Sequence, residues 1–264
     1  MRDLGALVWI VLEVTRMQLG IYQNAAAMSA LDRWNEAIAH NLASSSVNGY
    51  RRTNTAFRAE AFGNIPQVSR TKAANEPKQA AFFPASTLGI DFKQGNVVNT
   101  GRSLDVAITS EGFFEVKRSD GTTLYTRGGS FSTRADRTLV DARGNEVLGQ
   151  GGAPIQLLPD QPDVSIAEDG SISQGATIIG KISVVNFNDT QKLIPVEDGY
   201  FAAPSNLVPE PFEGRVQQGA IESGNASAIR EMVDMITVSR AYQASQKVMT
   251  THDELIDKAI RNLG

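Results

Sequence analysis

Apolar residues near the start of the chain recur with the spacing of an α-helix. They are separated by steps of three and four residues, a pattern that predicts one amphipathic helix over residues 21–42. Polar Asn24 and Asn35 fall on the same stripe, where asparagine weakens a coiled coil but fixes its register and partner number. The apolar members of the stripe are Ile21, Met28, Leu31, Ile38 and Leu42.

Turn-forming residues follow this helix over residues 44–49, which read Ser-Ser-Ser-Val-Asn-Gly. We expect Asn48 and Gly49 to shape the turn, because both residue types adopt turn conformations readily. Arg51 and Arg52 come directly afterwards. Two interpretations of this pair stay open: a charged contact between neighbouring subunits, or a turn exposed to solvent.

The C-terminal end carries a second and longer helical pattern. Residues 226–262 contain neither glycine nor proline, so they can form one helix of about 55 Å, and Gly224-Asn225 is a plausible start signal. A heptad runs through Met235, Val238, Tyr242, Ser245, Met249, His252, Ile256, Ala259 and Leu263. A second stripe, Ile229, Met232, Val233 and Ile236, covers a neighbouring face at the start of the helix.

The two ends therefore share a heptad pattern, and we expect them to pack together or with the ends of other copies. The long C-terminal helix has more apolar surface than one short N-terminal helix can cover. The residues predicted to form this assembly seam are Met28, Leu31, Ile38, Leu42, Met235, Val238, Tyr242, Met249 and Ile256.

The middle of the chain has the opposite character. Short β-rich runs alternate with turn dipeptides such as Asp120-Gly121, and no alternation of strands with helices indicates a parallel sheet. The predicted strands are Leu104–Ile108, Phe113–Lys117, Thr122–Arg127, Val164–Ile166 and Lys181–Phe187. The predicted fold class is α+β, with an antiparallel β-rich domain inserted between two long terminal helices that form a coiled-coil-like assembly region.

Four segments follow from these patterns. Residues 17–60 form the N-terminal helix and turn, 61–218 the β-rich domain with an irregular linker at 64–84, and 219–264 the C-terminal helix. Residues 1–16 are the first of the four segments. Their apolar run is too short to span a bilayer, and three interpretations stay open: a mis-assigned start with translation beginning at Met17, a disordered or helical extension, or a signal peptide or anchor.

Composition narrows the function. The chain has 264 residues, and 25 basic against 29 acidic residues give a net charge of −4, which disfavours nucleic acid as a partner. Cysteine is absent, so disulfides, thiolate metal sites and cysteine nucleophiles are excluded. His40 and His252 are not spaced as metal ligands, and we interpret them, like the methionines on the stripes, as packing residues.

No catalytic motif is found. The glycine clusters at 128–129 and 149–152 lack the context of a phosphate-binding loop, and the scattered carboxylates of the β region are typical of turns. We therefore predict no enzyme activity, no cofactor, no metal and no small-molecule substrate. Two alternatives stay open: a cell-wall hydrolase, which needs two close carboxylates, and a monomeric β-domain adaptor, which would not assemble.

Three motifs, in order, resemble the bacterial flagellar axial proteins. Residues 41–52 read Asn-Leu-Ala-Ser-Ser-Ser-Val-Asn-Gly-Tyr-Arg-Arg, similar to the family's N-terminal signature. Residues 95–131 contain Thr-Gly-Arg-Ser-Leu-Asp-Val-Ala-Ile, Glu-Gly-Phe-Phe and Tyr-Thr-Arg-Gly-Gly-Ser-Phe, which resemble the pattern of rod and hook proteins. Residues 219–225 read Gly-Ala-Ile-Glu-Ser-Gly-Asn, near the family's Gln-Gly-x-Leu-Glu-x-Ser-Asn-Val.

This resemblance covers residues 17–264 and implies a structural subunit of the flagellar rod in the periplasm. Such a subunit is exported by the flagellar export apparatus without a cleaved signal peptide. It polymerises with itself and with other axial proteins through its terminal helices, and it transmits torque. The chain's length favours a proximal rod protein, with a distal rod protein as the alternative.

Overall fold

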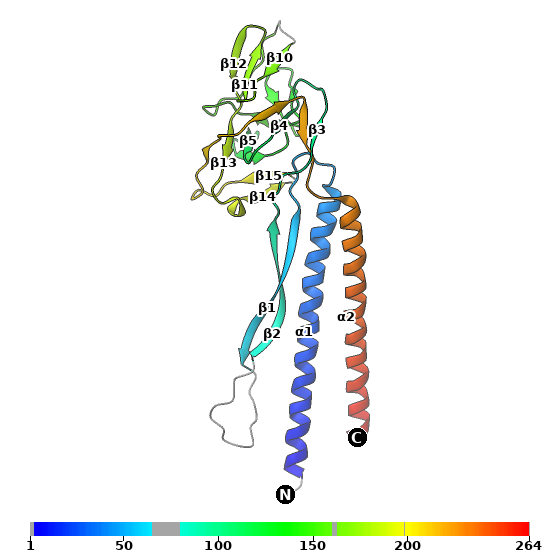
Figure 1. The fold of residues 1–264 in the computed structure, drawn as a ribbon. Helices are drawn as coiled ribbons and strands as arrows, with labels where there is room; N and C mark the ends of the chain where they lie inside the picture. Colours follow the sequence, from blue (N-terminus) through cyan, green and yellow to red (C-terminus); the bar gives the residue numbers. More distant parts are fainter. Residues whose placement is uncertain (1–2, 65–79, 160–162, 198, 264) are drawn as a thin grey trace. The chain divides into compact units, whose positions relative to one another are not determined.

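The computed structural model describes residues 3–64, 80–159, 163–197 and 199–263 (Figure 1). The chain forms two compact units. A helical unit comprises the residues up to 40, residues 54–89 and those from 229 onward, while a β-rich unit comprises residues 41–53 and 90–228. The chain therefore passes between the two units four times.

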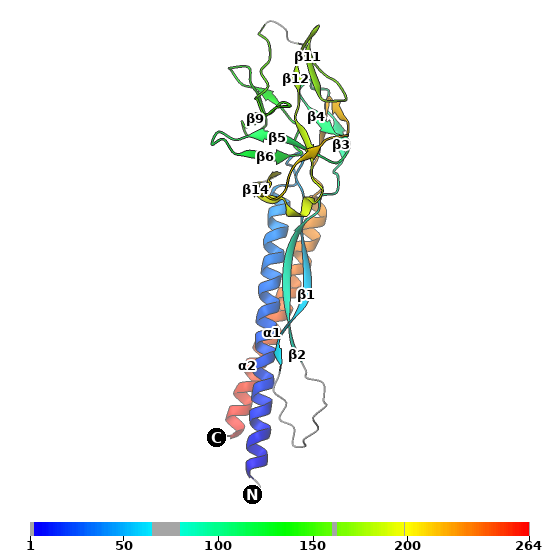
Figure 2. The same ribbon diagram turned by 90° about the vertical axis from the view of Figure 1, so that its left-hand side faces the viewer.

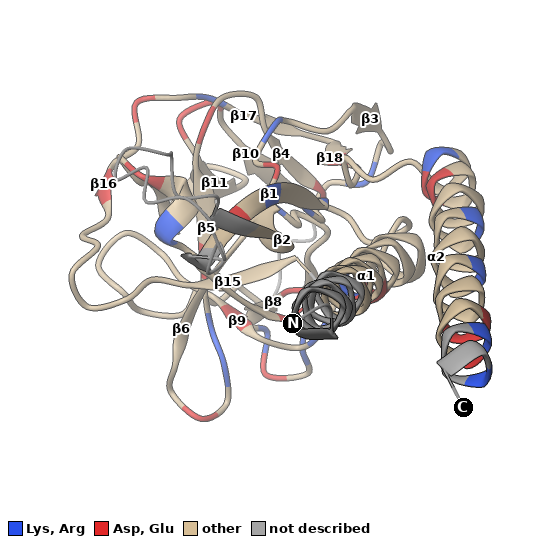
Figure 3. Cartoon of the chain, turned by 90° about the horizontal axis from the view of Figure 1, so that it is seen from below, with Lys and Arg blue, Asp and Glu red and all other residues tan. Residues whose placement is uncertain are grey.

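The helical unit contains two long helices, α1 (Asp3–Ala43) and α2 (Ala228–Leu263), and a two-stranded sheet of β1 (Thr53–Asn64) and β2 (Ala80–Ile90). Within this unit α1 lies between the sheet and α2 (Figures 1 and 3). Its Trp34 ring packs edge-on against Phe57 of β1, with ring centroids 5.4 Å apart. No helix among the described residues is both long enough and apolar enough to cross a membrane.

The β-rich unit is built from short antiparallel strands (Figure 2). Its largest sheet has nine strands in the order β14-β15-β6-β5-β9-β8-β7, with β13 pairing β5 and β16; the other sheets are β10-β11-β12, β17-β4 and β18-β3. These strands are β3 (Val97–Asn99), β4 (Val106–Ile108), β5 (Phe113–Lys117), β6 (Thr123–Thr126), β7 (Ser132–Thr133), β8 (Leu139–Val140), β9 (Glu146–Val147), β10 (Val164–Ile166), β11 (Ser171–Gln174), β12 (Thr177–Lys181), β13 (Val184–Asn186), β14 (Ile194–Glu197), β15 (Tyr200–Ala202), β16 (Glu210–Pro211), β17 (Val216–Gln218) and β18 (Ala220–Glu222), with a 3-10 turn, η1 (Thr190–Lys192).

Successive side chains of β5 point to opposite faces of the sheet, and the core of this unit is accordingly divided into two clusters. Phe114 is fully buried in the larger cluster, where its ring meets that of Phe131 edge-on at 5.2 Å. Its neighbour Phe113 points to the opposite face of the sheet and joins a smaller aromatic cluster with Phe187 and Phe201. Both faces of the strand are therefore covered, as its largely apolar sequence requires.

The predicted α+β class and the antiparallel character of the β-rich part are confirmed. The predicted segments around β4, β5, β6, β10 and β13 contain strands, and the two terminal helices are present. The first helix is longer than the range 21–42 predicted from its pattern, since α1 begins at Asp3, and a helical extension was one of the interpretations left open for residues 1–16.

One sequence-based expectation is wrong in part. Strand β1 crosses the boundary drawn at residue 60, and β2 begins at Ala80 inside the segment assigned to an irregular linker at 64–84. Residues 65–79 of that segment lie outside the described residues. The alanine-rich composition did not indicate these strands, because alanine has a low β propensity. Both strands form because they pair with each other.

Candidate functional site

The predicted seam on α2 forms one continuous covered face. Val238 is buried, and Met235, Tyr242, Met249 and Ile256 are half-buried. Ser245, on the same face, accepts a hydrogen bond at its carbonyl oxygen from the Nδ2 of Asn24 on α1, at 2.8 Å. This bond places the seam of α2 against α1 of the same chain.

The predicted seam on α1 is covered as well. Ile38 is buried, and Met28, Leu31 and Leu42 are half-buried, whereas Asn35 is exposed. The polar Asn24 is satisfied by its bond to Ser245, so of the two seam asparagines it is the one that can fix the register of the helix pair.

A second covered face of α1 was not expected from the sequence. Ala30 and Ala37 are buried there, and Trp34 packs on Phe57 of the two-stranded sheet. Gln23 on the same face donates from Nε2 to the carbonyl oxygen of Phe82, at 3.0 Å. Small alanines carry little weight in a hydrophobic pattern, so the sequence did not indicate that this face of α1 is covered.

The second apolar stripe of α2 is exposed. Ile229, Met232, Val233 and Ile236 have 78%, 52%, 57% and 55% of their surface accessible, and we call these four residues the α2 stripe. At 100° per residue the stripe lies on the side of the helix opposite the seam. Further along α2 the same side carries polar residues, among them Arg240, Gln243 and Lys247, and charged residues recur along the helix (Figure 3).

The turn after α1 depends on Gly49. Its φ is +72°, and a Cβ placed there would lie 2.3 Å from the backbone nitrogen of Gly128, so no other residue fits. The Gly49 N–H donates to the carbonyl oxygen of Glu222 at 2.8 Å. Asn48 precedes it with its carbonyl oxygen directed toward Gly128, since a Cβ on Gly128 would lie 3.0 Å from that oxygen.

Asn41 holds the other end of this turn. Its Oδ1 accepts hydrogen bonds from the hydroxyl of Tyr50 and from the backbone nitrogen of Thr53, at 2.9 and 2.8 Å. Its Nδ2 donates to the carbonyl oxygen of Thr53 at 2.9 Å. One buried amide therefore closes a loop of the eleven residues between Asn41 and Thr53.

Next to this turn lies a buried cluster of charges, which we call the junction cluster: Arg51, Arg127 and Glu222. The Oε1 of Glu222 accepts from the Nη2 of Arg51 at 2.6 Å and from the backbone nitrogen of Gly95 at 2.8 Å. Its Oε2 accepts from the Nε of Arg127 at 2.8 Å and lies 2.7 Å from Nη2 of the same arginine. The carboxylate is thus surrounded by donors.

Arg127 is fully satisfied as a donor. Its Nη1 donates to the carbonyl oxygens of Ser110 and Gly112, both at 2.7 Å, and its Nη2 reaches that of Ile108 at 3.4 Å. Burial lowers the pKa of Arg127, the carboxylate of Glu222 opposes that shift, and the charge of Arg51 adds to it. The two cations therefore repel each other around one shared anion.

From the sequence, two interpretations were open for the pair Arg51 and Arg52, a subunit contact or a turn exposed to solvent, and the exposed turn is wrong for Arg51. Arg51 is buried and paired within the chain. Arg127 and Glu222 were not singled out, although both lie in the quoted motifs. The two residues are 95 positions apart, so local patterns do not connect them, and the only signal was one charged residue within each of two otherwise uncharged motifs.

Asn225 is not a helix start signal either, because α2 begins three residues later at Ala228. Its side chain instead joins two loops of the β-rich unit. The Nδ2 donates to the carbonyl oxygens of Asp91 and Lys93, and the Oδ1 accepts from the backbone nitrogen of Arg52 at 2.6 Å. The segments that follow α1 and precede α2 are therefore anchored at the same place.

Comparison with known proteins assigns this architecture to a family. The model of the C-terminal region of flagellar basal body rod FlgEFG proteins matches residues 217–262, and the model of the FlgE/F/G hook protein D1 domain matches residues 107–174. Together with the relatives below, these matches show that the chain belongs to the family of flagellar rod and hook proteins.

The relatives include both types of rod protein. The flagellar basal-body rod protein FlgG of Agrobacterium fabrum is 32% identical over 262 residues, covering 90% of this chain and 97% of that protein. The rod protein FlgF of Caulobacter vibrioides is 29% identical over 249 residues, covering 94% and 99%. FlgF of Mesorhizobium japonicum is 30% identical, with the same coverage over 252 residues.

Proposed function

We propose that this protein is a structural subunit of the flagellar basal-body rod and that copies of it polymerise through α1 and α2. In this proposal the covered seam holds the helix pair of one copy together. The α2 stripe then makes the contact between copies. The turn at Asn48 and Gly49 holds the exit of α1 in a fixed path within the β-rich unit.

The observation that carries the proposal is the exposure of the α2 stripe. Four neighbouring apolar side chains, each more than half accessible, lie on the side of α2 that α1 does not cover. Exposed apolar patches of this kind mark interaction sites. A head-to-tail contact that does not close into a ring builds a filament, which is the form that a rod requires.

Ile236→Asp tests this contact. The aspartate is harmless on an exposed monomer surface but would be a buried, unpaired charge in a subunit contact, so assembly should fail while folding is unchanged. The assay is sedimentation and electron microscopy of concentrated protein, with circular dichroism as the folding check. Gln243→Asp, on the same side of α2 but beyond the stripe, is the matched control and should assemble like the wild type.

Either of two results would overturn the proposal. The first is normal filament formation by Ile236→Asp. The second is a wild-type protein that stays monomeric at every concentration and does not enter rods when expressed in a flagellated cell that lacks its own copy.

Within the family we propose a proximal, FlgF-like position. The alignments to FlgF use 94% of this chain within 249 to 252 aligned residues, so they need few gaps. The alignment to Agrobacterium FlgG is longer, at 262 residues, yet uses only 90% of this chain. That FlgG therefore contains segments that this chain lacks, although its 32% identity keeps a distal, FlgG-like position as the alternative.

An in-frame deletion in the source bacterium separates the two positions. Purified basal bodies whose rods stop near the inner membrane would support the proximal position. A longer rod stub without a hook would support the distal one.

Our proposal also places the mature subunit in the periplasm, delivered by the flagellar export apparatus without a cleaved signal peptide, where it transmits torque and contacts other axial proteins.

A further inference from the structure

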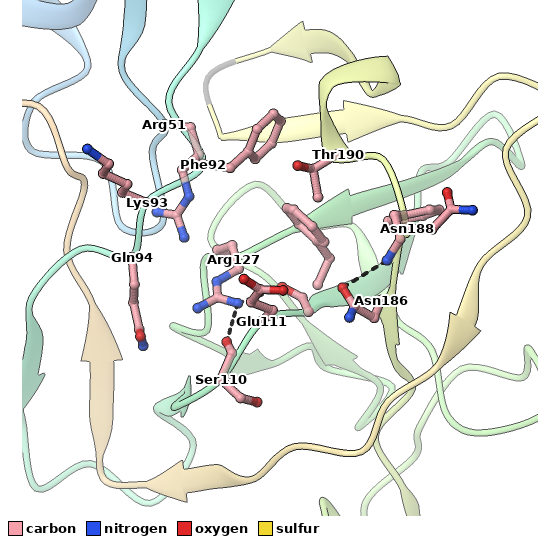
Figure 4. A pocket seen from close by; sticks show the side chains of 13 residues that line it. Arg51, Phe92, Lys93, Gln94, Ser110, Glu111, Arg127, Asn186, Asn188 and Thr190 are labelled. Carbon is pink, nitrogen blue, oxygen red and sulfur yellow. Dashed lines mark hydrogen bonds between the residues drawn. The ribbon is translucent and has the colours of Figure 1, made fainter.

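A cavity of about 360 Å³ lies in the β-rich unit beside the junction cluster (Figure 4). Arg51 and Arg127 line one side, and Asn186 and Thr190 line the opposite side. Glu111 lies next to Arg127. The volume falls in the lower part of the range of small-ligand sites, which suits a side chain or a small organic acid.

The two arginines of the cluster differ in how their N–H groups are used. Arg127 has an acceptor for each of its donors, as described above. Arg51 is 3% exposed, yet its Nε has no hydrogen-bond partner among the described residues, and its Nη1 has only a long contact of 3.4 Å to the carbonyl oxygen of Tyr50. A buried guanidinium with unused donors is costly, because burial removes the water that would otherwise bond to it.

The positive and negative charges of the junction cluster also do not balance. Two buried guanidinium groups share one buried carboxylate, so the junction cluster carries one net positive charge. Glu111, an exposed residue, acts on Arg127 only through space. A second anion beside Arg51 would balance the cluster and satisfy its donors at the same time.

We propose that this cavity binds a carboxylate group, which accepts a hydrogen bond from the Nε of Arg51. A carboxylate fits because it is planar and matches the fork of donors that a guanidinium presents. The group can come from a free small organic acid or from an acidic side chain of a second copy of this chain. This site belongs to the folded single chain and does not depend on the polymerisation proposed above.

The test is a titration of the wild-type protein with sodium acetate at constant ionic strength, followed through the NMR signal of the arginine Nε–H groups. Acetamide, which has the same shape but no charge, and sodium chloride are the reference titrations. We expect a saturable shift of one arginine signal with acetate only. An equal response to chloride or acetamide, or no saturable response, would overturn the proposal.

Two variants identify the residues. Arg51→Lys keeps the charge that pairs with Glu222 but removes the Nε donor, so acetate should bind at least about tenfold more weakly. Glu111→Gln removes a competing negative charge from an exposed position, so the fold is not at risk and acetate should bind about three- to tenfold more tightly. Glu254→Gln, an exposed change on α2, is the control and should bind as the wild type does.

The same experiment distinguishes the two sources of the carboxylate. If a second copy supplies it, the Arg51 signal shifts with protein concentration before any acetate is added, and acetate then reverses self-association. If the group comes from a free acid, the signal is independent of protein concentration and acetate alone moves it. Unchanged acetate binding in Glu111→Gln would contradict the site even if Arg51→Lys fails to fold.

Discussion

Two nitrogens of Arg127 contact the same carboxylate oxygen of Glu222: its Nε lies 2.8 Å and its Nη2 2.7 Å from Oε2. This leaves the other carboxylate oxygen for Arg51 and the backbone of Gly95. Glu222 ends β18, shortly before α2, and Arg51 follows the turn after α1. One carboxylate therefore links the segments that lead to both helices with the strand ends of the β-rich unit.

Glu222→Gln should destabilise the β-rich unit strongly. Two guanidinium groups would remain buried without a counter-charge, and removing one partner of a buried pair costs about 3–5 kcal/mol. Urea denaturation of the monomer measures the change. Glu168→Gln is the control, because its ion pair with Arg215 is exposed on both sides and should contribute almost nothing. Similar midpoints for the two variants would refute the role of the cluster.

Gly49→Ala should prevent the turn after α1 from closing. The added methyl group would meet the backbone of Gly128 and Arg127 at 2.3 and 2.4 Å, in addition to the strain of a positive φ. Gly121→Ala has a similar φ of +88° but no atom within 4 Å, so it isolates the strain, about 1 kcal/mol. Thermal unfolding should show a much larger loss for Gly49→Ala. Equal losses would mean that the close approach to Gly128 is unimportant.

Ile38→Asp should unfold the helix pair within a single copy. Ile38 is 1% exposed, and an aspartate there would be buried without a partner, at a penalty of several kcal/mol. The readout is the helical signal in circular dichroism of dilute monomer. Ile236→Asp provides the contrast, since it should keep full helicity and lose only assembly. Full helicity in Ile38→Asp would show that the seam is not needed in the monomer.

Tyr200 should make the protein sensitive to alkali. Its hydroxyl donates to the Oδ2 of Asp141 at 2.8 Å, and burial, followed by the charge of Asp141, raises the pKa of the phenol above its ordinary 10.0. Above pH 10 an unfolded Tyr200 ionises while the folded one stays neutral, so this part of the stability is present below pH 10 and is lost as the pH rises.

Tyr200→Phe checks this effect. It should cost about 1–2 kcal/mol at neutral pH, because Asp141 loses a donor, and it should flatten the fall in stability above pH 10. The measurement is the denaturation midpoint as a function of pH. Tyr22→Phe, at a side chain that is 66% exposed, should leave both the midpoint and its slope unchanged. An identical alkaline slope in Tyr200→Phe and the wild type would disprove the assignment.

The elements that depend on neighbours in sequence could be predicted. The heptads indicated both helices and the residues of the covered seam, and alternating runs such as Phe113–Lys117 indicated strands of the β-rich unit. Gly49 was identified because its residue type and its position after a helix already imply a turn. Each of these signals lies within a few residues of the structure that it predicts.

The remainder depends on contacts between distant segments. Arg51 and Glu222 are 171 residues apart, and the sequence around each of them does not indicate the other as its partner. Strand β1 pairs with β2, and the contact of Trp34 with Phe57 of β1 could not be predicted before that strand was known. The second apolar stripe of α2 was visible in the sequence, but only its exposure separates it from the seam.

The four passages of the chain between the helical and the β-rich units have a mechanical consequence. A single linker would act as a swivel, about which one unit could spin while the other stayed still. Four peptide connections in parallel cannot rotate about a common axis without winding around one another. If the proposed rod subunit carries torque, a twist applied to the helical unit is therefore shared among four covalent routes into the β-rich unit of the same chain.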